Sequence, residues 1–583
     1  MSERTWRWAA PSVALLALAA SIAGIANGFT YDDRYIVEMN PTMKGLAGWW
    51  RVFASPYWPL EWGGDGYRPL TILAFKLEYA IGRGSPVAFH ATNILLYALV
   101  SVLVFRLAAQ LFDREHRWAA WLSAALFAVH PVHVEAVANV VGQSELLVAG
   151  ALLTATLLYV RDRRAGPLRP ATTAWILLLY ALACFAKEHA IVLPALLGAA
   201  EVIVVRDAEP WRARVSRLRP FFLLTVLVAV SFVWVRSLVL SDHSIGGFQP
   251  FTPFSSLRIT NADRMLTALG VVPQWLRLLY WPAHLSSEYG PPDVEIAQGP
   301  SVTQLPGLAL LVAVLAFAFV LRKRQPIVTF GIAFVCIVLA PSSNFLLPAG
   351  IVLAERTLFL PSVGAMLVAG AVAVIVATRW ESSFAERPSF RTAAWAMCAV
   401  VLAAGVARSA RRSTVWREND RLFRQAVVDS PLSYRAHYML GAWHFENGRK
   451  REGEASYRRA LNLFPYDPFL SYNMAEQYRL AGLCGPAIPL YRWTFGLNAQ
   501  FPLGRAMFAS CLLDQGFYDE ARARAFDAIR NGADLKRMRW VILVTDSIRD
   551  SGKSSPVAQR NGIGKAPDSM QKAARSEGDR RGG

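Results

Sequence analysis

Two adjacent acidic residues, Asp32 and Asp33, come directly after the first long apolar stretch of the chain. A chain that leaves a bilayer first meets the membrane surface at such a point, and ionisable groups there are usually functional or solvated. The two carboxylates are therefore candidate functional groups. The alternative interpretation is a turn that ends a helix, because Asp also favours turns.

A second polar pair, His90 and Asn93, lies at the start of another apolar stretch. The two residues are three positions apart, so they share one face of a helix. Such a pair is suited to positioning a polar substrate, but it is more typical of hydrogen bonding between membrane helices.

The densest polar cluster contains His130, His133 and Glu135. Two histidines and a carboxylate so close together suggest metal ligands. The spacing is not H-E-x-x-H, however, and Pro131 breaks any helix between the histidines. The same groups can hydrogen-bond a polar substrate, so both interpretations stay open.

Basic residues stand beside carboxylates in two further clusters. Lys187 and Glu188 separate two apolar stretches, and Glu355 and Arg356 precede another. Arginine grips a phosphate with two prongs, and lysine at a membrane surface suits an anionic headgroup. Arg68, in the first loop, and Asn344, in a Pro-Ser-Ser-Asn sequence, complete the candidate set.

These polar groups require a scaffold that spans a membrane. The chain of 583 residues is 54% hydrophobic and 18% charged, with a mean hydropathy of +0.30. About 20 apolar residues suffice to cross a bilayer as a helix. We therefore predict an all-α protein with a polytopic membrane helix bundle of about eleven spans, at residues 8–28, 87–110, 118–133, 143–160, 172–186, 190–206, 220–240, 304–321, 326–341, 359–378 and 391–408.

Basic residues in the short connections predict the orientation, because Lys and Arg concentrate in cytoplasmic loops. They cluster at residues 161–169, for example, and are absent from residues 132–142. We predict a cytoplasmic N-terminus and, after an odd number of crossings, a C-terminal domain on the non-cytoplasmic side. Residues 262–284 are apolar enough to cross, but crossing would place the basic residues 322–324 outside. We therefore expect an interfacial or re-entrant helix there.

The net charge of +19 does not indicate a nucleic-acid partner, because much of it lies in short loops and in the tail. The five cysteines include no C-x-x-C pair. Cys484 and Cys511 would pair if the C-terminal domain occupies an oxidising compartment.

A helix-pair pattern repeats at 34 residues from Tyr434, which is the period of a tetratricopeptide repeat. Further copies begin at Pro468 and Pro502. Such an α-solenoid usually binds a peptide or protein on its concave surface, although a structural cap without a ligand has the same pattern. We predict four regions: a membrane domain at 1–408 with a first outer loop at 29–86, a connector with a partial repeat at 409–433, repeats at 434–550 and a disordered basic tail at 551–583.

The motifs, in this order and spacing, resemble the transmembrane and tetratricopeptide repeat-containing protein O-mannosyltransferases. The resemblance covers residues 29–534 and rests on Asp32-Asp33, Tyr67-Arg68-Pro69-Leu70, Phe89-His90 with Asn93, His130-Pro131 with Glu135 and Val137, Lys187-Glu188, Pro341 to Asn344 and Ala354 to Pro361. The chain departs from the pattern at Gln143, where many relatives have Arg, and at Thr357-Leu358-Phe359, which replaces a Tyr-rich version.

The resemblance implies a glycosyltransferase of the GT-C fold. It would move a sugar, with mannose expected, from a polyprenyl-phosphate donor to Ser or Thr hydroxyls of an exported protein in one inverting displacement. It implies a general base at Asp32 or Asp33, with Asp32 favoured, and phosphate binding by Arg68, Lys187 and Arg356. The residues expected to position sugar or acceptor are His90, Asn93, His130, His133, Glu135, Glu188, Asn344 and Glu355.

The partners implied are the lipid-linked sugar, an acceptor protein or peptide held by the repeats, and the membrane. No cofactor beyond the lipid-linked sugar is implied, and a divalent metal is an open alternative that is not favoured. The host membrane would be a bacterial inner membrane facing the periplasm, or that of the endoplasmic reticulum.

Other functions stay open. A GT-C transferase that modifies a lipid or a glycan would have the same motifs. A transporter would place charges near the middle of the bilayer, whereas here they lie at the ends of the spans. A non-catalytic scaffold would need one span to anchor its repeats, and about eleven are predicted.

Overall fold

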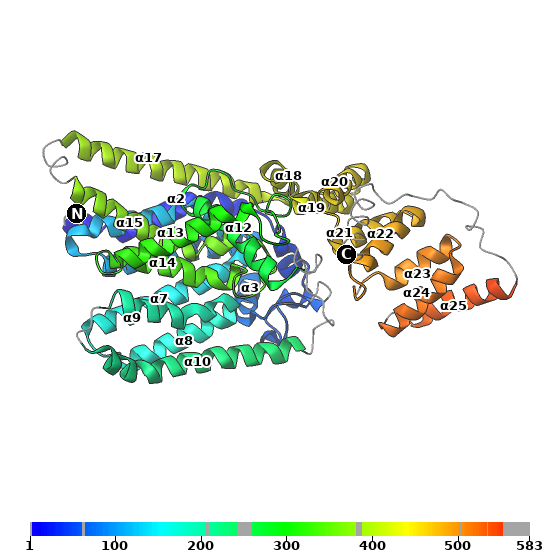
Figure 1. The fold of residues 1–583 in the computed structure, drawn as a ribbon, viewed down its shortest axis with the longest axis horizontal. Helices are drawn as coiled ribbons and strands as arrows, with labels where there is room; N and C mark the ends of the chain where they lie inside the picture. The colour runs from blue at the N-terminus through cyan, green and yellow to red at the C-terminus, as the bar shows by residue number, and fades with distance from the viewer. Residues whose placement is uncertain are drawn as a thin grey trace.

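The structure is a computed structural model that describes residues 3–60, 64–205, 209–241, 259–380, 388–501, 503–532 and 535–551. Within these residues the regular secondary structure is helical, without a strand. Long helices form a bundle, and shorter paired helices lie beyond one end of it (Figure 1). We call this end of the bundle the outer end.

Each predicted span coincides with a helix of the bundle. These helices are α2 (Ala9–Ser21) with η1 (Ile22–Ala26), α4 (Pro86–Leu111), α5 (Arg117–Ala128), α7 (Gln143–Ala165), α8 (Pro170–Ala186), α9 (Leu193–Ile203), α10 (Trp211–Ser241), α13 (Leu305–Leu321), α14 (Pro326–Leu339), α15 (Pro361–Arg379) and α17 (Pro388–Ser413).

The number of crossings depends on how short helices are counted. Among the described residues, 7 helices are long and apolar enough to cross a membrane, or up to 8 if the bent pair formed by α5 and the segment with α6 (Val134–Ala138) is one span. The predicted eleven add the shorter helices α8, α9 and α14. The chain is therefore a multi-pass membrane protein.

Glycines bring the bundle helices into backbone contact. A Cβ on Gly364 of α15 would lie 2.3 Å from the backbone oxygen of Gly331 of α14. Gly370, further along α15, packs equally closely on Ala119 and Ser123 of α5. Small residues at such positions let membrane helices approach closely. These contacts position α15, which begins shortly after the candidate residue Arg356.

The helix α12 (Asn261–Tyr280) lies in the segment predicted to be interfacial. Near its start, Arg264 donates to the backbone oxygen of Asn344, and near its end the oxygen of Leu279 lies 3.0 Å from Nε2 of His130. Both contacts are made with loops at the outer end of the bundle. Among the described residues, α12 is not one of the helices that are long and apolar enough to cross a membrane, and its interfacial placement stays a prediction.

The paired helices beyond the bundle follow a connector made of η13 (Thr414–Arg417) and α18 (Asn419–Asp429). They are α19 (Tyr434–Glu446) with α20 (Lys450–Leu463), α21 (Pro468–Leu480) with α22 (Cys484–Leu497), and α23 (Arg505–Asp514) with α24 (Tyr518–Arg530), followed by α25 (Leu535–Asp550). We call α19–α25 the helical array. Pro502 and the predicted tail beyond Ser551 lie outside the described residues.

A disulfide joins Cys484 of α22 to Cys511 of α23, as the sequence suggested. The bond links two successive helix pairs across a separation of 27 residues. Such a link is expected only where the array folds in an oxidising compartment.

The disulfide is testable by counting thiols. Protein unfolded without reductant should take up three alkyl groups, on Cys184, Cys336 and Cys398, and five after reduction, as measured by intact-mass spectrometry. Because the disulfide constrains the unfolded chain, replacing both Cys484 and Cys511 by Ser should lower the free energy of unfolding of the array by about 2–4 kcal/mol. Five modified cysteines without reductant would contradict the pairing.

Candidate active site

The two acidic residues stand at an unusual turn at the outer end of the bundle. Tyr31, which precedes them, has a φ of +56°, and a single π-helical turn, η2 (Arg34–Glu38), follows them. A left-handed backbone is uncommon for a residue with a side chain, and such conformations cluster at functional sites. The amide of Tyr31 donates to Oδ1 of Asn419 at 2.8 Å, which fixes the turn.

Asp33 is buried and serves as an acceptor for backbone amides. Its carboxylate accepts from the amides of Thr30 at 3.4 Å, Val140 at 3.1 Å and Val141 at 2.9 Å. Burial raises the pKa of Asp33 to about 8, although the three amides favour the charged form. Both oxygens are therefore engaged in holding the turn η8 (Val140–Gly142) against the residues that follow η1.

Asn93 holds the same turn from α4. Its Nδ2 donates to the carbonyls of Val137 at 3.2 Å, Asn139 at 3.1 Å and Val140 at 3.4 Å. The sequence predicted that Asn93 positions the sugar or acceptor. In the structure its side-chain amide binds backbone carbonyls instead, and it thereby helps to position the backbone amides that donate to Asp33.

Asp32 differs from its neighbour because its carboxylate is not engaged. Within the part of the chain that the structure describes, no hydrogen bond or ion pair involves the Asp32 side chain, which is half-buried. Burial raises its pKa to about 6, against the lowering by Arg356 and Arg435. A carboxyl group with this pKa is largely ionised at neutral pH and free to accept a proton.

Arg356 is paired with Glu135, and its charge also acts on Asp32. The Arg356 amide donates to Oε2 of Glu135 at 2.9 Å, and its Nη1 contacts Oε1 of the same carboxylate. Against the lowering by burial, the charges of Glu135 and Asp32 raise the pKa of Arg356 above its ordinary value. The guanidinium therefore pairs with one carboxylate and interacts electrostatically with a second, which lies more than a hundred residues away from the first in the sequence.

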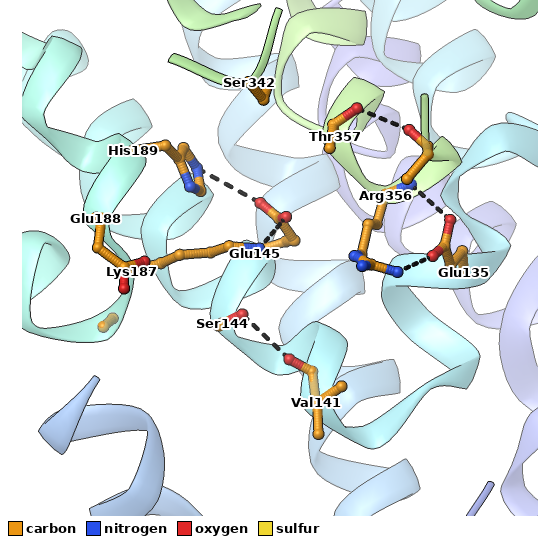
Figure 2. A network of polar contacts seen from close by, with 12 residues as sticks. Glu135, Val141, Ser144, Glu145, Lys187, Glu188, His189, Ser342, Arg356 and Thr357 are labelled. Atoms are coloured by element: carbon orange, nitrogen blue, oxygen red, sulfur yellow. Dashed lines mark hydrogen bonds and ion pairs between the residues drawn. The ribbon is translucent and has the colours of Figure 1, made fainter. Parts of the chain in front are cut away.

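A second group of charges faces Arg356. Figure 2 shows Lys187 and His189 both directed at Glu145, and Arg356 directed at Glu135. His189 Nε2 lies 3.4 Å from Glu145 Oε2, and Lys187 Nζ contacts Oε1. Burial lowers the pKa of Lys187, and the positive charges of Arg68 and Arg356 lower it further, although Glu145 opposes them. Mutual influence of this kind requires that these charges lie in one region.

Arg68 pairs with Glu188, the residue that follows Lys187 in the chain. Its Nε donates to Oε2 of Glu188 at 3.0 Å, and its guanidinium lies 4.6 Å from the centre of the Tyr57 ring. Arg68, Lys187 and Arg356, the three cations predicted for phosphate binding, are therefore gathered together, each beside a carboxylate.

The two histidines of the dense cluster bind structural partners. His133 contacts the hydroxyl of Tyr97 at 2.9 Å through Nδ1 and that of Ser362 at 2.8 Å through Nε2, while His130 contacts the oxygen of Leu279. Among the residues with described positions, no group of three His, Cys, Asp or Glu side chains is placed to hold a metal ion.

Three other predicted residues lie in loops or helix ends around the site. Glu355 accepts from the amide of Ser286 at 2.6 Å and from the hydroxyl of Tyr289 at 2.7 Å, and burial raises its pKa to about 8. Asn344 adopts a φ of +62° and bonds the backbone of its own loop. His90 Nε2 lies 3.4 Å from the oxygen of Gly28. These side chains shape the loops and do not join the three cations.

Several charged residues at the site were not predicted from the sequence. Glu145 pairs with both Lys187 and His189. Both residues lie within polar clusters of the sequence, which offered a local signal. Glu288 and Arg435 contact Tyr31, the residue before Asp32. The sequence offered no local signal for either one, because Arg435 lies within the first repeat and Glu288 within a loop.

An apolar groove of about 410 Å³ runs along α3 (Pro69–Gly82), α4, α7 and α8. Its wall is formed by aliphatic side chains, with Thr154 as the polar exception. Leu146 and Ala186, at one end of the groove, directly adjoin Glu145 and Lys187 in the sequence. The groove therefore leads from the ion pair along the membrane part of the bundle.

The chain is similar over most of its length to curated protein O-mannosyl-transferases. It is 24% identical to Protein O-mannosyl-transferase F38B6.6 of Caenorhabditis elegans over 77% of this chain and 62% of that protein. It is 28% identical to Protein O-mannosyl-transferase TMTC4 of Homo sapiens over 74% and 62%, respectively. A shorter match to Protein O-mannosyl-transferase Tmtc2 of Drosophila melanogaster has 35% identity over 47% of this chain and 30% of that protein.

The chain spans about three fifths of the length of the first curated relatives it matches. No family model matches the chain, and no solved structure does.

The different engagement of the two acidic residues predicts different effects on stability. Asp33→Asn places an amide group against a backbone N–H, so a buried donor loses its acceptor, and the protein should lose about 1–3 kcal/mol of stability. Asp32→Asn should leave stability unchanged, because the described residues offer its carboxylate no bond to lose. Thermal unfolding of both variants in the same detergent compares them. Equal melting temperatures would contradict the assignment of Asp33 as the structural member.

Proposed function

Starting from the distant homology of this chain to the protein O-mannosyl-transferases, we propose that it transfers mannose from a polyprenyl phosphate to Ser or Thr hydroxyls of a protein. The observation that carries the proposal is the carboxylate of Asp32, which is unengaged among the described residues and interacts electrostatically with Arg356, itself paired with Glu135. A base next to a cation is what transfer of a sugar away from a phosphate requires.

Asp32 acts on the acceptor in this proposal. Its carboxylate takes the proton of the hydroxyl while the hydroxyl oxygen forms a bond to the anomeric carbon of the sugar. The bond between that carbon and the phosphate oxygen breaks in the same step, so the configuration is inverted. Its pKa of about 6 is close enough to neutral pH for efficient proton transfer.

The cations receive the phosphate that departs. The guanidinium of Arg356 makes one hydrogen bond, to Glu135, among the described residues, and an arginine has five N–H donors. The side chains of Arg356 and Lys187 keep 20% and 16% of their surface exposed, so a ligand can reach them. Glu135, Glu145 and Glu188 hold the three cations in position before the donor arrives, which is electrostatic preorganisation.

The apolar groove accounts for a lipid donor. A polyprenyl chain is hydrocarbon, and each buried methylene contributes about 0.8 kcal/mol. A chain lying between α4, α7 and α8 would bring its phosphate to the end where Leu146 and Ala186 adjoin Glu145 and Lys187. A nucleotide-linked donor has no use for such a groove.

The proposal includes an arrangement of the chain about the membrane. Residues 1–408 would form the catalytic membrane domain, with the outer end facing a non-cytoplasmic, oxidising compartment. The helical array would be a tetratricopeptide repeat domain that holds the acceptor on the same side. The disulfide between Cys484 and Cys511 supports this orientation, because such bonds persist outside the cytosol.

Removing the base tests the chemistry directly. Asp32→Asn should lower kcat for transfer from mannosyl-phosphoryl polyprenol to a Ser/Thr acceptor peptide by about 10²- to 10⁴-fold, with the donor KM little changed. In the unchanged protein the rate should fall as the pH drops through about 6, because only the ionised carboxylate accepts the proton. Full activity of Asp32→Asn, or product that forms only on a lipid or a glycan, would refute the proposal.

The groove predicts a dependence on the length of the lipid. A Cβ added to Gly150, in the groove wall, meets nothing within 4 Å, so Gly150→Leu should fit the helix while filling the groove. The donor KM should rise about tenfold for a long polyprenyl chain, equivalent to about 1.4 kcal/mol, and little for a short one. Gly198→Leu on α9, where a Cβ also meets nothing, is the matched control. Equal KM values for both lipids in Gly150→Leu would exclude the groove as the lipid site.

A further inference from the structure

The segment that carries Asp32 is attached to the connector and to the helical array. Before it, the ring of Tyr31 packs against Trp416 and Phe423 of the connector. After it, Arg34 donates to Oε2 of Glu446 at 2.9 Å and lies over the ring of Trp443, both in α19. The backbone position of Asp32 is therefore set by helices that follow the membrane bundle.

Three polar side chains form the attachment nearest to Asp32. The hydroxyl of Tyr31 donates to Oε1 of Glu288, which lies in the loop after α12. Arg435, in the first turn of α19, donates to Oε2 of Glu288 at 2.9 Å and to the Tyr31 hydroxyl at 3.3 Å. The side chains of Arg435 and Glu288 keep only 19% and 5% of their surface exposed. The triad thus links the array, the loop and the turn of the acidic pair.

We propose that Arg435 is a positioning residue of the active site, which with Glu288 holds Tyr31 so that Asp32 faces Arg356. The helical array then completes the catalytic centre in addition to any role in binding an acceptor. The proposal rests on the function proposed above, since it assumes Asp32 as the base.

Charge gives Arg435 an effect on Asp32 that a purely structural contact lacks. Arg435 lowers the pKa of Asp32 and Glu288 raises it, so the two act on the base with opposite signs. The charged and titratable groups that face Asp32 from the surrounding elements are Arg356, Glu135, Arg435, Glu288, Asp33, Tyr31, Tyr35 and Tyr57. The two cations in this set come from different parts of the chain. Arg356 precedes α15 of the membrane bundle, and Arg435 belongs to the array.

Other bonds join the start of α19 and the residue before it to the loop after α12 without Arg435. The amide of Tyr434 donates to the oxygen of Pro291 at 3.1 Å, and the amide of Gly290 donates to Oγ of Ser433 at 3.1 Å. A variant of Arg435 should therefore keep the array in place while losing the contact to Tyr31.

The experiment compares four variants of the full chain in detergent or nanodiscs: Arg435→Ala, Arg435→Lys, Glu288→Gln and Arg492→Ala. The last is the control, because Arg492 pairs with Glu520 inside the array and does not contact the acidic pair. The readouts are the pH profile of mannosyl transfer and hydrogen–deuterium exchange of residues 28–36.

Arg435→Ala should move the acid limb of the profile to higher pH by roughly 0.5–1 unit, because the base loses a neighbouring cation. Glu288→Gln should move it to lower pH, and Arg435→Lys should restore it toward the unchanged protein. Arg435→Ala should also speed exchange in residues 28–36, whereas Arg492→Ala should change neither readout.

An unshifted acid limb in Arg435→Ala, or shifts of the same sign in Arg435→Ala and Glu288→Gln, would overturn the proposal. Unchanged exchange of residues 28–36 in Arg435→Ala would overturn it as well, and this measurement needs no activity. Absence of transfer by the unchanged protein would instead refute the proposed function, so the two failures are distinguishable.

Discussion

The hydrogen bonds between the Asp33 carboxylate and the amides of Val140 and Val141 are the interaction on which the rest of the site depends. They join the chain leaving the first span to the turn that precedes α7, and Asn93 supports that turn from α4. A buried carboxylate is costly unless such donors satisfy it, so the turn and the acidic residue stabilise each other. Asp33 is thus engaged in structure, whereas the adjacent Asp32 carboxylate has no hydrogen bond or ion pair within the described residues.

The charges around Asp32 are nearly balanced before any ligand is present. Three cations from three separate segments face Glu188, Glu145 and Glu135, and desolvation would otherwise make each of them unfavourable. Pairing fixes the orientation of the three cations, and in the proposed function they would not have to reorganise when an anion arrives. Asp32 differs from these carboxylates. The two cations that lower its pKa, Arg356 and Arg435, are paired with Glu135 and Glu288.

The helical array and the bundle meet at the turn of the acidic pair, which makes the C-terminal helices part of the environment of the site. Tyr31 is held by Asn419, Glu288 and Arg435, and its left-handed backbone is tolerated because these contacts determine it from several directions. In the proposed function, the array would bind the acceptor and Asp32 would take its proton. The turn that contains Tyr31 and Asp32 would connect these two sites.

The sequence by itself determined the class of the protein: the helical membrane bundle, the helix pairs spaced by 34 residues, and the residue types of the site, because apolar length, period and motif order are local properties. Which of Asp32 and Asp33 is engaged, that Asn93 and the histidines bind structural partners, and that Glu145, Glu288 and Arg435 join the site were decided only by the tertiary structure. Hydrogen-bond partners and charge pairs are made between segments far apart in the chain, and their identity depends on packing that no local pattern records.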